Sequence, residues 1–293
     1  MPINVSSNKN VLIAGPTASG KSALAMMIAR AQGGVIVNAD ALQVYGGWRI
    51  VTARPSAQDE LDLPHQLYGH VPFDAPYSVG DWLREVKTLL GQRLIIVGGT
   101  GLYFSALTNG LADIPPTPDD IRAEGDASTL QLLVSQLDSE TSKRIDLSNR
   151  ARVQRAWEVN KTTGASLATW QDSTPPPVIH LDDCTPILLN APKGWLTPRI
   201  ERRFDLMLEI GALDEAREIL PKWDPTHASS KAIGASDLIR HLNGEFSLDQ
   251  ARENVVVATR QYAKRQRTWF RKRMKDWHQV DLSSTDLSTA FEL

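Results

Sequence analysis

Residues 15–22 have the sequence Gly15-Pro16-Thr17-Ala18-Ser19-Gly20-Lys21-Ser22 and follow the apolar run Val-Leu-Ile-Ala at 11–14. Leu24, Met27 and Ile28 then recur at helical spacing, so the segment predicts a glycine-rich phosphate loop between a strand and a helix. Glycines permit positive φ, and the N–H groups of such a loop turn toward an anion at the positive end of the new helix. In this arrangement Lys21 bridges phosphate oxygens and Ser22 ligates Mg²⁺. The loop predicts a site for a di- or triphosphate but leaves the fate of the phosphate open.

Two further apolar runs predict buried parallel strands. Residues 35–37 lead into Asn38-Ala39-Asp40, and residues 94–97 lead into Gly98-Gly99-Thr100-Gly101. Because the carboxyl ends of parallel strands meet at one edge of a sheet, these segments and the phosphate loop converge there. The fold class is therefore α/β, a doubly wound parallel sheet of the phosphate-loop NTPase type.

Proline-rich stretches at 114–118 and 173–177 bracket a region in which leucines recur at helical spacing. We interpret this region as a small helical insertion. The predicted organisation is a phosphate-loop core at 1–112, a helical insertion at 113–183, and the rest of the core at 184–293. The last part opens with a returning strand at 186–190 and contains a long helix from about 248 to 275.

Composition narrows the class of protein. The 293 residues carry a formal charge of −2, which excludes an overall basic coat for nucleic acid and leaves only local clusters. Cys184 is the single cysteine, the first residues resemble no signal peptide, and no apolar run reaches membrane-spanning length. We expect a cytoplasmic protein with no membrane partner.

The long C-terminal helix carries one such local cluster. Arg260, Lys264, Arg267 and Arg271 recur at four, three and four residues, with no acidic residue between positions 260 and 275. Solvated helix faces usually mix both signs, so this stripe favours a polyanion, most simply nucleic acid, over a merely solvated face.

Asp40 has three interpretations from its position alone. An acid after the second strand of a phosphate-loop protein serves as a metal ligand, as a general base, or as a helix cap. The residue types and spacing do not choose among these roles.

Several segments together resemble the tRNA dimethylallyltransferases, the IPP transferase family. The resemblance rests on residues 15–22, on Asp-Ala-Leu-Gln-Val-Tyr at 40–45 with Thr-Ala-Arg-Pro at 52–55, and on Val-Gly-Gly-Thr-Gly-Leu-Tyr at 97–103. It extends to His65, to residues 152–159 of the insertion, and to the basic segment 259–271. No Cys/His pair follows the basic helix, which implies a bacterial type without a zinc finger.

This resemblance implies the transfer of a dimethylallyl group from dimethylallyl diphosphate to the exocyclic amine of the adenosine 3′ of the anticodon, by a monomer. It implies that Asp40, Lys21 and Thr100 are catalytic, Asp40 being the general base. Residues 15–22 and Lys231 bind the diphosphate, and Ser22 is the ligand of Mg²⁺. Lysine 231 stands where many members place arginine, which weakens bidentate phosphate recognition but keeps the charge. The expected tRNA contacts are Asp40, Ala41, Leu42, Gln43, Thr100, Arg122, Ala151, Arg152, Val153, Gln154 and Arg155 from the resemblance, and Arg260, Lys264, Arg267 and Arg271 from the charge pattern.

Three alternatives remain at this stage. A small-molecule kinase also places an acid after the second strand, but leaves the basic helix unexplained, and the strand at 94–97 ends in glycines rather than a metal-binding aspartate. An adenylate prenyltransferase of cytokinin synthesis shares the loop and the base but needs neither the insertion nor the basic helix. A non-catalytic, nucleotide-gated RNA-binding module has no use for a complete base-and-loop site.

Overall fold

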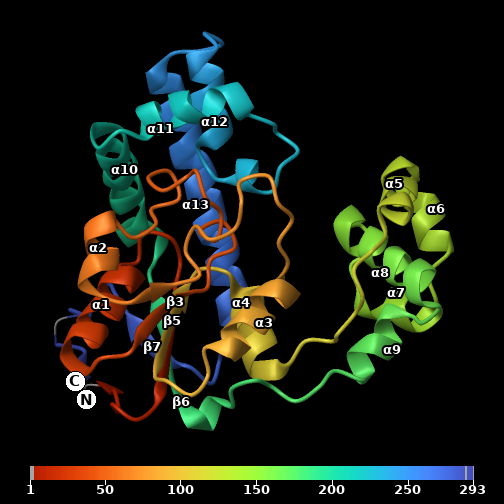
Figure 1. The fold of residues 1–293 in the computed structure, drawn as a ribbon, viewed down its shortest axis with the longest axis horizontal. Helices are drawn as coiled ribbons and strands as arrows, with labels where there is room; N and C mark the ends of the chain where they lie inside the picture. Colours follow the sequence, from red (N-terminus) through yellow and green to blue (C-terminus); the bar gives the residue numbers. More distant parts are fainter. Residues whose placement is uncertain (1–2, 288, 293) are drawn as a thin grey trace. The chain divides into compact units, whose positions relative to one another are not determined.

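The computed structural model describes residues 3–287 and 289–292 (Figure 1). Contacts within the chain divide it into a core unit, Met1–Thr108 with Ile179–Leu293, and an insertion unit, Asn109–Val178. The sequence placed the insertion at 113–183. The chain has already joined the core unit at Ile179, because its N–H donates a hydrogen bond to the carbonyl of Leu107 (3.1 Å).

The core unit is built on a six-stranded parallel sheet of order β4-β3-β5-β2-β6-β7. Leu12 of β2 lies opposite Ile96 of β5 on one side and Pro186 of β6 on the other. Strands in this position are buried on both faces, which explains why they are apolar runs rather than alternating ones. The strands are β2 (Asn10–Ala14), β3 (Val35–Asn38), β4 (His65–Gln66), β5 (Leu94–Gly98), β6 (Cys184–Asn190) and β7 (His278–Asp281), with a separate parallel pair of β1 (Ile3–Asn4) and β8 (Phe291–Glu292).

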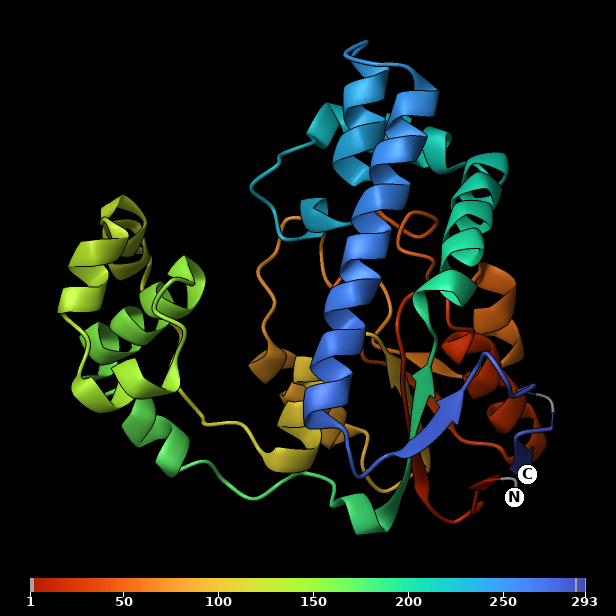
Figure 2. The ribbon, with the colours of Figure 1, turned by 180° about the vertical axis from the view of Figure 1, so that it is seen from behind.

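Helices cover both sides of this sheet, with α1 on one side and α3 and α4 on the other (Figure 1). This confirms the predicted doubly wound class. The long helix α13 begins at Leu248, as predicted, and ends at Arg273; Figure 2 shows it running the length of the core unit. The helices are α1 (Lys21–Gln32), α2 (Ala57–Asp62), α3 (Val79–Thr88), α4 (Gly101–Asn109), α10 (Lys193–Glu209), α11 (Ala212–Ile219), α12 (Ala235–Leu242) and α13 (Leu248–Arg273), with 3₁₀ turns at Leu181–Asp183, Leu220–Lys222 and Ser229–Lys231.

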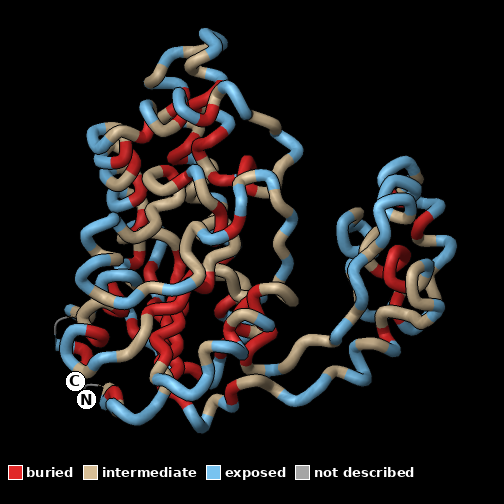
Figure 3. Tube along the Cα trace, in the orientation of Figure 1, coloured by how far each residue is buried: buried red, intermediate tan, exposed pale blue. Residues whose placement is uncertain are grey.

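The buried residues of the core unit follow the strands and the helix faces turned toward them (Figure 3). One apolar cluster joins the sheet to α1 through Leu24 and Ile28. A second cluster packs α10, α11, α12 and α13 together around Trp48, Phe204 and Leu238. None of the described helices combines the length and the apolar content needed to cross a bilayer.

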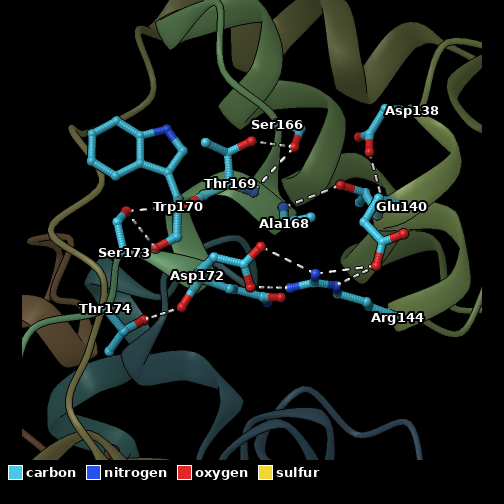
Figure 4. Close-up of polar contacts among 12 residues, drawn as sticks. Asp138, Glu140, Arg144, Ser166, Ala168, Thr169, Trp170, Asp172, Ser173 and Thr174 are labelled. Atoms are coloured by element: carbon cyan, nitrogen blue, oxygen red, sulfur yellow. Dashed lines mark hydrogen bonds and ion pairs between the residues drawn. The ribbon is translucent and has the colours of Figure 1, made fainter.

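The insertion unit has a small core of its own around Leu133, Val153 and Trp157. Arg144 at the end of α7 donates two hydrogen bonds to the carboxylate of Asp172 in α9 (2.6 and 3.1 Å) and also pairs with Glu140 (Figure 4). This basic side chain is therefore engaged in contacts inside the unit. The helices are α5 (Asp119–Ala127), α6 (Leu130–Ser135), α7 (Ser139–Arg144), α8 (Arg150–Thr163) and α9 (Leu167–Asp172).

Candidate active site

The phosphate loop has the backbone that its sequence predicts. It connects β2 to α1, and positive φ values occur at Ala18 (63°) and Gly20 (85°). A Cβ on Gly15 would lie 2.8 Å from the Ser19 hydroxyl and 3.1 Å from the Leu189 side chain, so this position accepts only glycine without rearrangement. The loop is thus closed tightly on itself and on β6.

A cavity lies beside the loop and brings together three charged side chains, Lys21, Asp40 and Arg203. Arg203 donates a hydrogen bond to the hydroxyl of Thr17 in the loop (2.8 Å). Neither cation forms an ion pair with a carboxylate within 4 Å in the described part of the chain. Two cations therefore face one carboxylate, and an anionic ligand would complete the charge balance.

The electrostatics of Lys21 reflect this surplus of positive charge. Removal from water is the main cause that lowers the pKa of Lys21 to about 8, the nearby Asp40 carboxylate opposes it, and Arg203 lowers it further. Burial also lowers the pKa of Arg203, again against the attraction of Asp40. A bound diphosphate would favour the charged form of both side chains.

Asp40 is held by its neighbours rather than capping a helix. The buried side chain of Asn38 accepts a hydrogen bond from the Asp40 N–H (2.8 Å) and donates to the Asp40 carbonyl (2.9 Å). The Asp40 carboxylate accepts from the Leu42 N–H (3.0 Å), which is an Asx turn. Residues 41–44 form a turn and the next helix begins at Ala57, so no helix starts here for Asp40 to cap.

The predicted site residues around Asp40 divide into two groups. Leu42 and Gln43 line the cavity, and Gln43 donates to the carbonyls of Thr52 (2.8 Å) and Ala53 (3.1 Å). Thr100 does not line the cavity. Its hydroxyl accepts the Ala41 N–H (2.9 Å), which ties the end of β5 to the Asp40 turn.

Most of the remaining cavity wall is apolar, with Thr52, Thr259 and Tyr262 also lining it. It is formed by side chains of α10 and α13 and of the segments near them. The charged end and the apolar wall together suit a ligand with an anionic head and a short hydrocarbon group. The apolar lining residues are Val51, Ile200, Phe204, Met207, Ile233 and Val255.

Sequence reasoning missed Arg203 and assigned an anion contact to Lys231. Lys231 is exposed in a 3₁₀ turn and does not line the cavity. A signal for Arg203 was present, because it lies between Ile200, Phe204 and Met207 on the buried stripe of α10. A cation on an apolar helical stripe indicates a partner that the helix itself does not provide.

The basic stripe of α13 lies partly in a second hollow. Lys264, Arg267 and Arg271 line it together with Lys275, whereas Arg260 does not. Arg267 donates a long hydrogen bond to the Ala191 carbonyl (3.5 Å), and its Nε is buried without a partner. The stripe therefore presents at least three cations on one concave surface.

In the insertion unit, several predicted tRNA contacts gather around Glu158, which is only 1% exposed. Gln154 donates to its carboxylate (3.1 Å), Arg122 pairs with it (3.4 Å), and Arg155 donates to the hydroxyl of Thr117 beside it (2.7 Å). Burial lowers the pKa of Arg155, and Glu158 opposes this effect. Sequence reasoning missed Glu158. This residue lies three positions after Arg155 and four after Gln154 on α8, a spacing that indicates contact.

The five consecutive residues 151–155 do not form one surface. Ala151 and Arg152 are exposed, but Val153 is fully buried in the core of the insertion unit. A ligand would therefore reach only the backbone of Val153, because helical residues at adjacent positions face different directions.

The sheet order and the phosphate loop define a phosphate-loop α/β protein in which two cations and a carboxylate line one cavity. A family model for IPP transferase matches residues 43–273, and a model for isopentenyl transferase matches residues 8–68. This chain belongs to the IPP transferase family. The family predicted from the sequence motifs is confirmed.

Relatives and solved structures agree with this assignment. The chain is 58% identical over 278 residues to a tRNA dimethylallyltransferase of Ruegeria sp. (strain TM1040), with 94% of this chain and 96% of that protein covered. It is 60% identical over 283 residues to a tRNA dimethylallyltransferase of Dinoroseobacter shibae, with the same coverage. A crystal structure of a eukaryotic dimethylallyltransferase acting on tRNA matches 98% of this chain and 75% of its own, with a TM-score of 0.80 and 25% identity.

Proposed function

We propose that this chain transfers a dimethylallyl group from dimethylallyl diphosphate to the exocyclic N6 amine of adenosine 37 in tRNA. The observation that carries the proposal is the cavity in which Lys21 and Arg203 face Asp40 beside an apolar wall. The names of the relatives support the tRNA substrate. Neither a kinase nor an adenylate prenyltransferase is favoured by these relatives.

The charged end of the cavity suits the leaving group. During transfer the C–O bond between the allylic carbon and the diphosphate breaks, and negative charge grows on the departing diphosphate. Lys21 and Arg203 both line the cavity, so their positive charges would stabilise the departing diphosphate. The short dimethylallyl group would lie against the apolar wall near Phe204 and Met207.

Asp40 supplies the base. The N6 lone pair of adenine is delocalised into the ring, so the amine is a poor nucleophile unless its proton leaves as the new C–N bond forms. The Asx turn fixes the Asp40 carboxylate, and one of its oxygens already accepts the Leu42 N–H. The other oxygen can take the N6 proton, which assigns Asp40 the role of general base.

Ser22 fits a role as a ligand of Mg²⁺. It lies in the first turn of α1, where the phosphate loop opens, and its hydroxyl is a hard oxygen donor. Within residues 3–287 and 289–292, no group of three His, Cys, Asp or Glu side chains could hold a metal. Mg²⁺ bound here would take its other ligands from diphosphate and water, as is usual for this ion, and would neutralise charge on the diphosphate.

The tRNA would be held through its phosphates. The α13 stripe and the cluster around Glu158 each present guanidinium groups suited to phosphate oxygens. The target base would leave the stack of the anticodon loop to reach the cavity. We also propose that the chain is a monomer, since its sequence has no heptad pattern. We propose that it acts in the cytoplasm.

One experiment separates the candidate activities. The purified protein is incubated with labelled dimethylallyl diphosphate and Mg²⁺, together with either tRNA or AMP, and in parallel with labelled ATP and a small alcohol. Label in tRNA at adenosine 37 supports the proposal. Label in AMP alone, or phosphorylation of the alcohol, would replace it with the corresponding alternative.

A further inference from the structure

One side chain of α13 connects two segments of the candidate active site. Gln266 is 5% exposed, and its Oε1 accepts a hydrogen bond from the Thr17 N–H in the phosphate loop (2.8 Å). Its Nε2 donates to the Gly99 carbonyl at the end of β5 (3.0 Å). The single amide therefore joins the loop, which receives the diphosphate, to the segment that follows β5.

The backbone around Gln266 is shaped to admit α13. A Cβ on Gly99 would lie 2.2 Å from the Gln266 Nε2 and 3.4 Å from an Asp40 carboxylate oxygen. A Cβ on Gly101 would lie 2.2 Å from the ring of Trp269, one helical turn after Gln266. The two glycines therefore serve the close approach of α13, and any side chain at either position would displace it.

The chain of hydrogen bonds continues from the loop to the anion site. Thr17, whose N–H is held by Gln266, accepts a hydrogen bond from Arg203 through its hydroxyl. On the other side, Gly99 precedes Thr100, whose hydroxyl accepts the Ala41 N–H of the Asp40 turn. Gln266 thus stands between the groups that bind the diphosphate and the segment that carries the base.

Only a side chain with both a donor and an acceptor can make this bridge. A glutamine amide has both, whereas a carboxylate would repel the Gly99 carbonyl and a methionine offers neither bond in this geometry. Because the amide is buried, removal of either bond leaves a backbone group without its partner. The bridge is therefore specific for the residue found here.

We propose that Gln266 is a positioning residue that sets the phosphate loop and Arg203 against the Asp40 segment. It does this without contact with either substrate. The inference rests on the proposed prenyl transfer. Displacement of reacting groups by about 1 Å can lower a rate by about 100-fold, so the bridge matters to transfer as well as to stability.

The test replaces Gln266 with methionine, which keeps the size and removes both bonds. Gln261→Met, an exposed glutamine on the same helix, is the matched control. We expect Gln266→Met to lower kcat/KM for dimethylallyl diphosphate by about 10- to 100-fold. It should also weaken inhibition by inorganic pyrophosphate, with tRNA affinity changed less than twofold. Gln261→Met should match the wild type in all three.

A double-variant cycle tests the route through Thr17. Thr17→Val removes the hydroxyl that Arg203 contacts, so the fall in rate of the combined variant should be smaller than the product of the two single effects. Fully multiplicative effects would overturn this route. Gln266→Asn, one methylene shorter, replaces the methionine variant if that protein does not fold, and should lower the rate less.

The outcomes separate this inference from the proposed function. Wild-type transfer and pyrophosphate inhibition in Gln266→Met, with only a lower Tm, would overturn the positioning role and leave a structural one. If the wild-type protein transfers no prenyl group, the proposed function fails, and binding of inorganic pyrophosphate to the variants still tests whether Gln266 shapes the anion site.

Discussion

The Arg203 guanidinium donates a hydrogen bond to the Thr17 hydroxyl at 2.8 Å, so that α10 supplies a cation directly to the phosphate loop. The two residues are 186 positions apart in the chain. The loop alone offers one lysine, Lys21, to a diphosphate. The contact with α10 brings a second cation to the cavity that Lys21 lines.

Replacement of Arg203 by glutamine should damage transfer more than binding of tRNA. Loss of one preorganised donor to developing charge lowers rates by about 10²- to 10³-fold. We expect kcat/KM for dimethylallyl diphosphate to fall by about that factor, with tRNA affinity unchanged. Arg202→Gln, the exposed neighbour, is the control. Similar effects in both variants would contradict the assignment of Arg203 to the anion site.

Asp40→Asn should abolish proton acceptance while keeping the turn. The asparagine oxygen can still accept the Leu42 N–H, so the fold and tRNA affinity should be retained. Loss of a general base typically lowers turnover by about 10²- to 10⁴-fold. Single-turnover transfer to tRNA measures this directly. A near-normal rate would remove Asp40 from the mechanism.

Those parts of the site that each lie within one short segment of the chain could be predicted from the sequence. The phosphate loop, the Asp40 turn and the glycines after β5 each follow a short apolar strand, and parallel strands bring their ends to one edge. The doubly wound fold and the family were predicted on this basis and are confirmed. The roles of the individual residues stay predictions.

The parts contributed by distant helices could not be predicted in the same way. Whether Arg203 faces a cavity or solvent depends on the packing of α10 against α13, which local patterns do not specify. The same holds for Gln266 and Glu158, whose burial depends on close approach at Gly99 and on the small core of the insertion unit. The family resemblance implied a diphosphate contact at Lys231, whereas tertiary packing places Arg203 at the cavity.

Binding of inorganic pyrophosphate to the free protein should weaken as the pH rises through about 8. The pKa of Lys21 is lowered to about 8, so its side chain is a cation below that pH and becomes neutral above it. The expected change approaches tenfold per pH unit well above 8. Lys21→Arg stays charged and should lack this inflection. Ionisation of pyrophosphate affects both proteins equally, so the ratio of their affinities reports the ionisation of Lys21 alone. A constant ratio from pH 7 to 9.5 would refute the contact between Lys21 and pyrophosphate.

The apolar wall should set the length of the prenyl group. Met207 lies on this wall, and its replacement by alanine shortens the side chain to a methyl group. A donor one isoprene unit longer, geranyl diphosphate, should then improve as a substrate relative to dimethylallyl diphosphate by about 10-fold or more, the usual effect of a methylene or two in an apolar pocket. Leu206→Ala, at the exposed neighbour on α10 that does not line this cavity, is the control. An unchanged ratio would place the prenyl group elsewhere.

The basic stripe of α13 should determine the salt dependence of tRNA binding. Each phosphate that a cation neutralises releases counterions, so log affinity falls linearly with log salt. Lys264 and Arg267 line one hollow, and their joint replacement by glutamine should reduce the magnitude of the slope by up to about 0.7 to 0.9 for each phosphate that is no longer neutralised. Binding should weaken for all tRNA sequences alike, while the affinity for dimethylallyl diphosphate changes little.

Lys87→Gln on α3, an exposed lysine, is the single-charge control and should leave the slope unchanged. An unaltered slope and affinity in the double variant would show that the stripe is a solvated face, and a large fall in thermal stability would show instead that Arg267 serves the contact with Ala191.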